Sequence, residues 1–186
     1  KDVISNLALS YYMTGQKDQA RELMPHAQNT FACRLINAID AYENNDTETA
    51  LSELRKLSEE KFDYAFVDYY MAKCYEKQNN DTKIKDCYNS AIDKNPIFFR
   101  AYRDFAKYSF EKGDFAEAKR KLRKALKLDE NNTEILNLLF YACYKLVKDN
   151  VCDYNVREAL GFAQAAENLG SFEYPDEKSE LSELLK

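Results

Sequence analysis

The sequence predicts an all-α fold built from repeated helix pairs, and three observations support this prediction. The 186 residues include only four Gly and three Pro, too few for the many turns of an all-β fold. Apolar residues recur at helical spacing along most of the chain. The pattern also repeats itself at a fixed offset of 34 residues. With 45% apolar and 32% charged residues, the composition is that of a globular chain with a sizeable core.

The 34-residue offset is clearest when residues 65–97 are placed over residues 99–131. Apolar residues coincide at several positions over this length, which is hard to obtain by chance. The coinciding pairs are Met71 and Phe105, Ala72 and Ala106, Ile84 and Ala118, Ala91 and Ala125, and Ile92 and Leu126.

The same frame extends toward the N-terminus, where Gly15 lies 98 residues before Gly113. A first repeat contains Leu7, Ala8, Tyr11, Gly15 and Ala20, and a second contains Asn37, Ala38, Ala41 and Ala50. The first repeat is about four residues short of the period. Pro25 lies within its second helix and is expected to stop or kink that helix, because proline removes a backbone donor and clashes with the preceding turn.

The fourth repeat shows how each half is read as a helix. Tyr102, Phe105, Ala106 and Ser109 follow the i, i+3, i+4, i+7 spacing of one helical face. Gly113 is expected to end this helix, because glycine adopts the left-handed conformation of a C-cap without strain.

The second helix of this repeat begins with a capping signal. Asp114 followed by Glu117 has the spacing of a capping box, and Leu122, Ala125 and Leu126 supply the buried face. The preceding repeat closes at Asn95-Pro96, because a residue before proline avoids the helical region.

Beyond residue 132 the pattern continues with looser spacing. We expect a connection around Asp149 to Tyr154 that is several residues longer than in the other repeats. A final amphipathic helix from Asp176 to Lys186 is expected to cover the end of the stack. The apolar positions are Leu136, Leu139, Phe140 and Cys143, then Ala159, Ala163 and Ala166, and finally Leu181, Leu184 and Leu185.

The run Ala101-Tyr102-x-x-Phe105-Ala106, followed by Gly113-Asp114-Phe115-x-x-Ala118 and Leu122-x-x-Ala125-Leu126, resembles the tetratricopeptide repeat. The resemblance implies a right-handed α-α superhelix of about five helix pairs with a C-terminal capping helix and a concave groove. It covers nearly the whole chain, so we expect residues 1–186 to form a single repeat domain. Departures from the family pattern are the absence of Trp, Ile84 in place of Ala, and Glu130 in place of Pro.

Motifs that carry chemistry are missing from the sequence. His26 is the only histidine, so any Ser-His-Asp or Cys-His centre would have to include it, and nothing nearby supports one. No phosphate-binding glycine loop and no calcium-binding loop is present. We therefore predict no catalytic residues, no metal and no cofactor, and we expect the chain not to be an enzyme.

The five cysteines are odd in number and show no C-x-x-C spacing. They are interpreted as free thiols, several of them small core residues, which favours a reducing compartment such as the cytoplasm. Zinc binding and disulfide formation by these cysteines remain alternatives. The residues are Cys33, Cys74, Cys87, Cys143 and Cys152.

Charge is distributed unevenly around a net value of −5. Residues 100–128 carry ten basic and four acidic residues, whereas residues 129–186 carry five basic and twelve acidic ones. The basic run from Lys119 to Lys124 has the composition of a nucleic-acid or nuclear-import patch. It is better interpreted as the solvated convex face of a helix with Leu122 inward. A mildly acidic chain is not a general nucleic-acid binder, and no stretch is long enough to span a membrane.

A basic, aromatic strip is predicted for the concave groove. The first helix of each pair lines that side in this fold, and i, i+3, i+7 spacing places three basic residues of the fourth repeat on one stripe. Equivalent positions in the neighbouring repeats extend it, and an acidic segment with an apolar anchor would suit the strip. The partner-binding residues predicted in this way are Tyr69, Lys73, Arg100, Arg103, Lys107, Phe110, Tyr141 and Tyr144.

These features predict a module that binds a protein or peptide partner through its concave groove. The carboxylate clamp by which some family members hold chaperone tails is not reproduced in any three successive repeats, so no such binding is expected. Two alternatives stay open, an accessory repeat domain of a larger enzyme or regulator and an architectural subunit of an assembly. Because the chain begins with Lys1 rather than Met, we expect it to be a piece of a longer protein.

Overall fold

The protein is represented by a computed structural model that describes residues 1–60 and 63–185. All regular structure in those residues is helical, which confirms the predicted fold class. The chain divides into two compact units, Lys1–Pro96 and Ile97–Lys186, which are described separately below. Their union into the single domain predicted for residues 1–186 stays a prediction.

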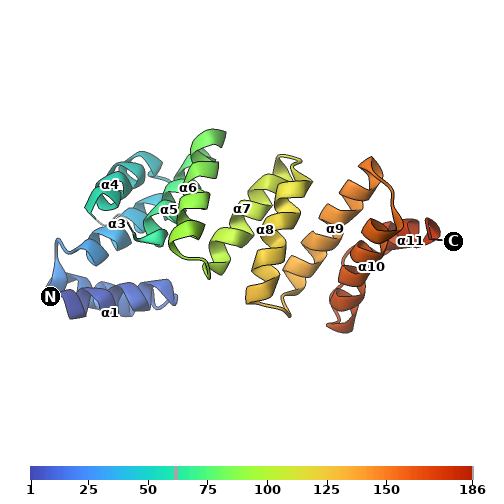
Figure 1. Cartoon of the computed structure of the whole chain (residues 1–186). Helices are drawn as coiled ribbons and strands as arrows, with labels where there is room; N and C mark the ends of the chain where they lie inside the picture. Colours follow the sequence, from blue (N-terminus) through green and yellow to red (C-terminus); the bar gives the residue numbers. More distant parts are fainter. Residues whose placement is uncertain (61–62, 186) are drawn as a thin grey trace. The chain divides into compact units, whose positions relative to one another are not determined.

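The first unit contains three helix pairs (Figure 1). Links of three residues join the two helices of each pair, and these short links make them neighbours in space. In chain order the elements are α1 (Asp2–Met13), α2 (Lys17–Leu23), the 3₁₀ helix η1 (Met24–Ala27), α3 (Phe31–Glu43), α4 (Thr47–Glu60), α5 (Ala65–Lys77) and α6 (Asp81–Lys94).

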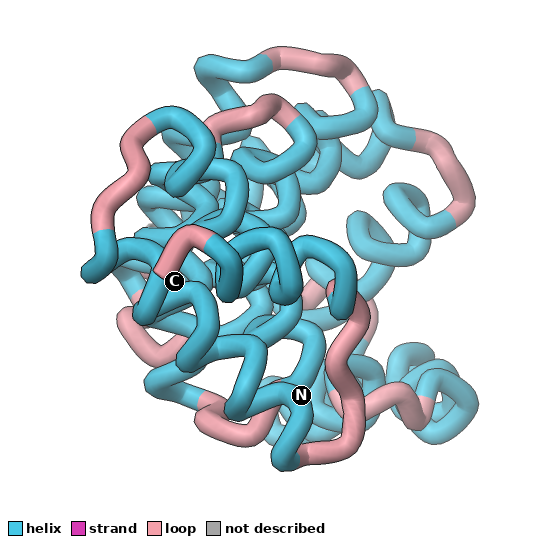
Figure 2. Tube along the Cα trace, turned by 90° about the vertical axis from the view of Figure 1, so that its right-hand side faces the viewer, coloured by secondary structure: helices cyan, strands magenta, loops and turns pink. Residues whose placement is uncertain are grey.

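The second unit contains two helix pairs and a shorter terminal helix, so the five pairs plus one helix of the sequence prediction are all present in the described residues. Figure 2 shows the loops between the helices as short segments of the trace. The elements are α7 (Phe99–Glu111), α8 (Phe115–Leu128), α9 (Thr133–Asp149), α10 (Asp153–Asn168) and α11 (Pro175–Glu183).

Left-handed residues mark the turn inside four of the pairs. Gly15 and Gly113 have φ values of 86° and 76°, as the predicted C-cap role of Gly113 requires. Asn45 and Asn79 take the corresponding positions in the second and third pairs with φ values of 63° and 54°. Asparagine is the non-glycine residue that tolerates this conformation best, which explains why so few glycines suffice.

The predicted cap of α8 forms, although its reciprocal half does not. The Asp114 carboxylate accepts a hydrogen bond from the backbone N–H of Glu117 at 3.1 Å. The Glu117 carboxylate instead accepts two bonds from the Arg120 guanidinium, at 2.8 and 2.7 Å. A charged bidentate partner one turn along the helix thus replaces the backbone group expected from the capping box.

The small residues of the repeat are buried. Ala72, Ala106, Ala118 and Ala125 are fully buried, as predicted from the repeat. Pro25 also behaves as predicted, since α2 ends at Leu23 and the chain continues as the 3₁₀ helix η1.

The prediction of a long connection around Asp149 to Tyr154 is wrong. Only three residues separate α9 from α10, as in the other pairs. The additional residues lengthen α9 to 17 residues, because the buried side chains of Tyr144 and Val147 continue its apolar face beyond the repeat pattern.

The terminal helix differs from its prediction at both ends. It starts at Pro175 and ends at Glu183, and Lys186 lies outside the described residues. Leu181 is buried, and Leu185 packs against the core of the second unit. Leu184, predicted to share their side, is 48% exposed, because the helix has ended before this residue.

Candidate partner-binding surface

Helix α7 carries the three basic residues of the predicted strip. Arg100 is exposed and forms no ion pair or hydrogen bond through its side chain among the described residues. Arg103 donates from Nε to Oδ1 of Asp104 at 2.7 Å. Lys107 forms an ion pair with Glu134, which belongs to α9.

Two carboxylates therefore accompany the three cations, and this pairing was not predicted. Asp104 follows Arg103 directly in the same helix, and Glu134 approaches from the first turn of α9. The side chains of Lys107 and Glu134 are 40% and 50% exposed, so water screens their attraction. The strip is consequently less basic than the sequence of α7 alone indicates.

An aromatic contact joins α7 to α9 at the end of the stripe. The Phe110 ring lies 5.6 Å from the Tyr141 ring and meets Phe115 edge to face at 5.2 Å. Tyr141 in turn lies 4.8 Å from the ring of Tyr174, in the segment before α11. Burial raises the pKa of Tyr174, so its hydroxyl stays neutral over the physiological range. Phe110 and Tyr141 are partly exposed and present an apolar edge.

Tyr144 was predicted to line the same groove, but the structure places its side chain in the core. Its ring is 5% exposed and stacks on Phe140 with the ring centroids 6.4 Å apart. Its hydroxyl donates to Glu180 of α11 at 2.6 Å. This hydrogen bond and the neighbouring Lys148 lower the pKa of the Glu180 carboxyl. Helix α11 thus covers the position that was expected to meet a partner.

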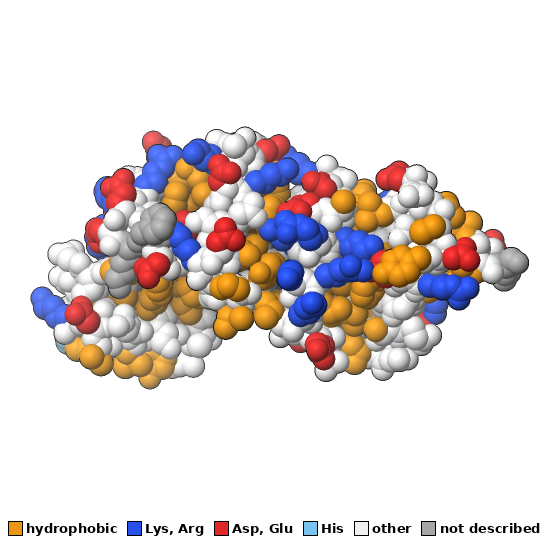
Figure 3. All heavy atoms as spheres, in the orientation of Figure 1, with side chains coloured by type: hydrophobic (Ala, Val, Ile, Leu, Met, Phe, Trp, Pro, Cys, Tyr) orange, Lys and Arg blue, Asp and Glu red, His pale blue; other side chains and the backbone are white. Residues whose placement is uncertain are grey.

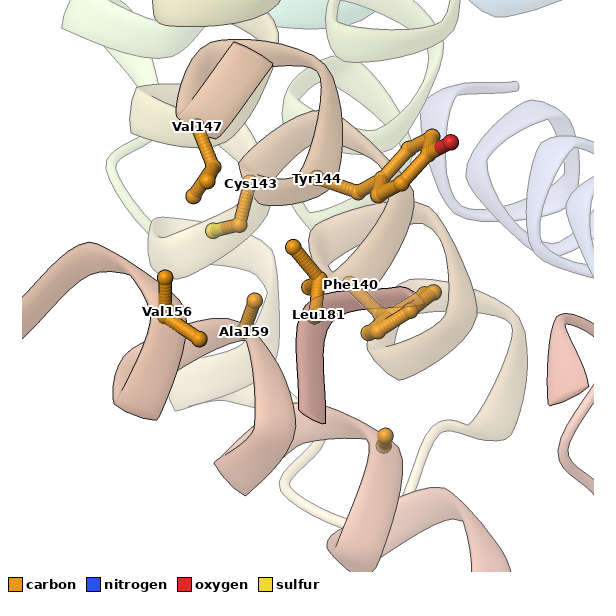
Figure 4. Packing of buried hydrophobic residues seen from close by; sticks show 8 residues of the cluster. Phe140, Cys143, Tyr144, Val147, Val156, Ala159 and Leu181 are labelled. Atoms are coloured by element: carbon orange, nitrogen blue, oxygen red, sulfur yellow. The ribbon is translucent and has the colours of Figure 1, made fainter. Parts of the chain in front are cut away.

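A buried core fixes α11 in this place. Leu181 is 1% exposed and lies between Phe140 of α9 and Ala159 of α10 (Figure 4). Four apolar residues surround this contact, namely Cys143, Val147, Val156 and Ala163. Burial raises the pKa of the Cys143 thiol. The packing explains why α9 offers only part of its length to a partner.

Asn137 holds the segment that leads into α11. Its side-chain amide donates to the carbonyl oxygen of Ser171 at 2.9 Å, and its Oδ1 accepts from the backbone N–H of Glu173 at 3.1 Å. The residue is 2% exposed, and a buried amide needs such partners. Sequence reasoning missed it, since the only signal was one polar residue among the apolar positions of α9.

The two predicted residues of the first unit have intrachain partners as well. Tyr69 is buried and packs edge to face on Tyr70 and Tyr88, with centroids 5.1 and 6.2 Å apart. Lys73, which is partly exposed, forms an ion pair with Glu76. Tyr69 therefore serves the core of α5 and α6, and only Lys73 reaches the surface.

Metal-ligating side chains do not cluster in the described residues. No group of three or more His, Cys, Asp or Glu side chains there could hold a metal ion. His26 is exposed on η1, and Cys152 is the exposed member of the five free cysteines, of which four are buried. Among the described helices, none has the length and hydropathy needed to cross a bilayer.

Comparison with known proteins shows which repeat and which fold the chain resembles. The tetratricopeptide-repeat family model matches residues 2–24 and 67–96, which contain α1 with α2 and all but the first two residues of α5 together with α6. No curated protein matches the sequence significantly.

Solved structures of MamA show the same fold. A structure of MamA AMB-1 is 16% identical, covers 90% of both chains and has a TM-score of 0.66. MamA MSR-1 is also 16% identical over 90% of this chain and 94% of the other, with a TM-score of 0.64. A further MamA structure is 13% identical over 90% of both chains, with a TM-score of 0.65. At this identity the likeness concerns the fold alone.

The family match, the 34-residue period and the helix pairs agree with one another. Together they describe a scaffold of repeated helices, the general kind of architecture that binds other proteins. Two segments of the chain match the tetratricopeptide repeat, and the chain has the fold of solved tetratricopeptide-repeat solenoids.

Proposed function

We propose that this chain binds a protein or peptide partner along α7 and α9, through Arg100, Arg103 and Lys107 with Phe110 and Tyr141 as an apolar end. One observation carries the proposal. The three basic residues recur at i, i+3 and i+7 on α7, and the contact between Phe110 and Tyr141 joins their stripe to the next first helix. Cations beside partly exposed rings suit an acidic segment with an apolar anchor.

The intrachain carboxylates do not prevent such binding. An exposed ion pair contributes only about 0–1 kcal/mol, so a partner carboxylate can replace Glu134 at Lys107 at small cost. Arg100 has no side-chain partner to give up among the described residues. The expected affinity is roughly micromolar, about −8 kcal/mol.

The proposed site is smaller than the strip read from the sequence. Tyr69 and Tyr144 are left out, because their rings are buried. Lys73 belongs to the first unit. It is added to the proposed site only if the substitution Lys73→Glu weakens partner binding. The function assigned is binding, and no chemical step on the partner is assigned to the chain.

The test begins with an affinity pull-down using the whole chain and identification of the retained protein by mass spectrometry. Binding of that protein is then compared for the wild type, for Arg103→Glu with Lys107→Glu, and for a matched control. The control, Lys83→Glu with Lys85→Glu, makes the same charge change at two exposed lysines of α6. We expect the first pair to weaken binding at least about tenfold at low salt, because charge reversal at a complementary surface is strongly unfavourable. Equal binding by the wild type and both variants would refute the groove assignment.

A further inference from the structure

A second surface lies on the other helices of the same unit, where an open cleft of about 610 Å³ separates α8 from α10. Figure 3 shows Lys and Arg side chains gathered over α8, with hydrophobic side chains beside them toward α10. None of the residues placed on α7 or α9 in the proposed binding strip takes part. The cleft is lined by Ala116, Lys119, Arg120, Arg123, Lys124, Leu126, Lys127 and Phe162.

The floor of the cleft is apolar. Leu126 of α8 and Phe162 of α10 are both partly exposed, and Phe162 packs with its buried side against the core of the unit. The floor continues into an adjoining hollow of about 490 Å³ that includes Gly161 and Ala165. A Cβ atom added at Gly161 would meet nothing within 4 Å, so the space above this residue is open. An incoming apolar side chain would therefore find an unfilled hydrophobic contact.

The rim is strongly basic. Five of the eight lining residues of the larger cleft are Lys or Arg, and none is acidic. Two of these cations, Lys119 and Arg123, form ion pairs with Glu158 of α10, whose side chain is 11% exposed. These pairs connect α8 to α10 and hold the walls of the cleft in place. Arg120 is fixed by its bidentate contact with Glu117.

Two cations of the rim have no such partner. Lys124 and Lys127 are exposed, and neither forms an ion pair or a side-chain hydrogen bond among the described residues. Their charges face solvent one turn apart on α8. They can be neutralised by an incoming anion without breaking an existing contact.

Buried Lys121 shows that the basic run of α8 is not simply a solvated face. Its ammonium lies 4.3 Å from the centroid of the Phe105 ring and 3.6 Å from Oε1 of Glu117, and its side chain is 3% exposed. Lys121 therefore lies inside the repeat. The other basic residues of the run line the cleft.

We infer that the cleft between α8 and α10 docks an acidic segment of a partner protein that inserts one large apolar side chain. The free cations Lys124 and Lys127 would pair with its carboxylates, and Phe162 with Leu126 would receive the apolar anchor. The charge complementarity selects an anion, and the apolar floor selects a protein segment over a nucleic acid. A single-stranded nucleic acid favours several stacking rings, whereas Phe162 is the one aromatic residue lining this cleft, and the acidic stretch 129–186 repels a long polyanion.

The experiment uses the whole chain and a short fluorescent peptide of Asp and Glu residues with one central Phe. Fluorescence anisotropy measures its dissociation constant at low salt, beside a peptide with Ser for Phe and a single-stranded oligothymidylate. The variants are Lys124→Glu with Lys127→Glu, the α6 control Lys83→Glu with Lys85→Glu, and Arg103→Glu with Lys107→Glu on α7. Gly161→Leu is a fourth variant, because leucine fills the open space and is a better helix former than glycine.

We expect the Phe peptide to bind with a dissociation constant in the micromolar range, roughly −8 kcal/mol. The Lys124/Lys127 variant and the Ser peptide should each weaken binding at least about tenfold, and Gly161→Leu should weaken it with the thermal unfolding midpoint unchanged or raised. The Lys83/Lys85 control should bind as the wild type does. The α7 variant removes any binding of the same peptide along α7 and α9, and in its background the Lys124/Lys127 exchange should still weaken the remaining binding at least about tenfold. The inference is overturned if the oligothymidylate or the Ser peptide binds as tightly as the Phe peptide. It is also overturned if the Lys124/Lys127 or Gly161→Leu variant binds unchanged, or if only the α7 variant loses binding. The last outcome would favour the function proposed for α7 and α9 and remove this site alone.

Discussion

Helices α1 and α9 hold the same place in their repeats but are buried very differently. Leu7 of α1 and Leu139 of α9 correspond through the repeat offsets that relate both to Phe105. Leu7 is 45% exposed, whereas Leu139 is fully buried. The neighbours of α1 are α2, η1 and α3, which all follow it in the chain, and α9 lies against α8 before it and α10 after it.

This difference distinguishes two kinds of helix contact that a repeat sequence encodes. Positions that face the partner helix of the same pair are buried in both helices, as fully buried Ala8 in α1 and Phe140 in α9 show. Positions that face the preceding pair are buried only where such a pair is present, since each repeat covers its neighbour. A repeat pattern therefore predicts contacts within a helix pair more securely than contacts with the preceding pair.

The largest expected effect comes from truncating the two leucines. Leu139→Ala should lower the free energy of unfolding by about 2–5 kcal/mol, because it leaves a cavity in a fully buried site. Leu7→Ala should change it by less than about 0.5 kcal/mol, because half of that side chain already contacts water. Urea unfolding followed by circular dichroism measures both variants. If both variants lost the same free energy of unfolding, the distinction between α1, which packs only on helices that follow it, and α9, which packs on helices before and after it, would be contradicted.

A smaller effect is expected where the two helices are alike. Ala106 of α7 and Ala8 of α1 are both fully buried. Ala106→Leu should overpack the pair of α7 and α8 and cost about 1–3 kcal/mol. Ala8→Leu should cost less, because α2 has only seven residues and can shift more readily than α8 with fourteen.

Thermal unfolding midpoints rank these two alanine variants, with Ala106→Gly as a control for the backbone. An unchanged midpoint for Ala106→Leu would mean that the helix pair has room for three more carbon atoms. That outcome would contradict the close approach inferred from the alanine positions.

The sequence predicted the helix pairs because their signals are local. Gly113, Asp114 and Pro25 act within a turn or two of the chain, and each has the predicted effect on its helix. The buried alanines follow from the same period, because a small residue must stand wherever two helix backbones come close. Fold class and helix pairing are therefore predictable from the sequence alone.

The binding surface was less predictable because its residues find their partners across the chain. Glu134 and Asp104 neutralise part of the α7 stripe, and Glu180 of α11 covers Tyr144. Offsets between repeats do not show which residues the predicted terminal helix covers, because this helix has no counterpart in the earlier repeats. The cleft beside Phe162 was missed for a related reason, since its two walls come from α8 and α10, which are separate in the sequence, and only their packing creates the space.

Helix capping offers a third and weaker difference, between α8 and α2. Asp114→Ala should cost about 1 kcal/mol, because it removes the acceptor of the Glu117 N–H at the start of α8. Native-state hydrogen exchange should show the loss as faster exchange in the first turn of α8. Asp114→Asn is the matched control, since asparagine supplies the same acceptor and should retain most of the protection.

The smallest expected effect is a gain in α2. Gln16 stands where Asp114 stands in the α7–α8 pair, with nearly the same backbone angles, φ −87° and ψ 61° against φ −82° and ψ 71°. No side-chain hydrogen bond caps α2, whereas Asp114 caps α8. Gln16→Asp should therefore stabilise α2 by about 0.5–1 kcal/mol, by accepting a hydrogen bond from the first turn and by placing a negative charge at the helix N-terminus. Gln16→Ala should leave the free energy of unfolding within about 0.5 kcal/mol of the wild type.

Hydrogen exchange of residues 17–23 measures both Gln16 variants, and slower exchange in the aspartate variant alone is the expected result. If aspartate gives no protection, the short α2 is limited by its break at Pro25 rather than by its missing cap, and the difference between α2 and α8 lies in helix length.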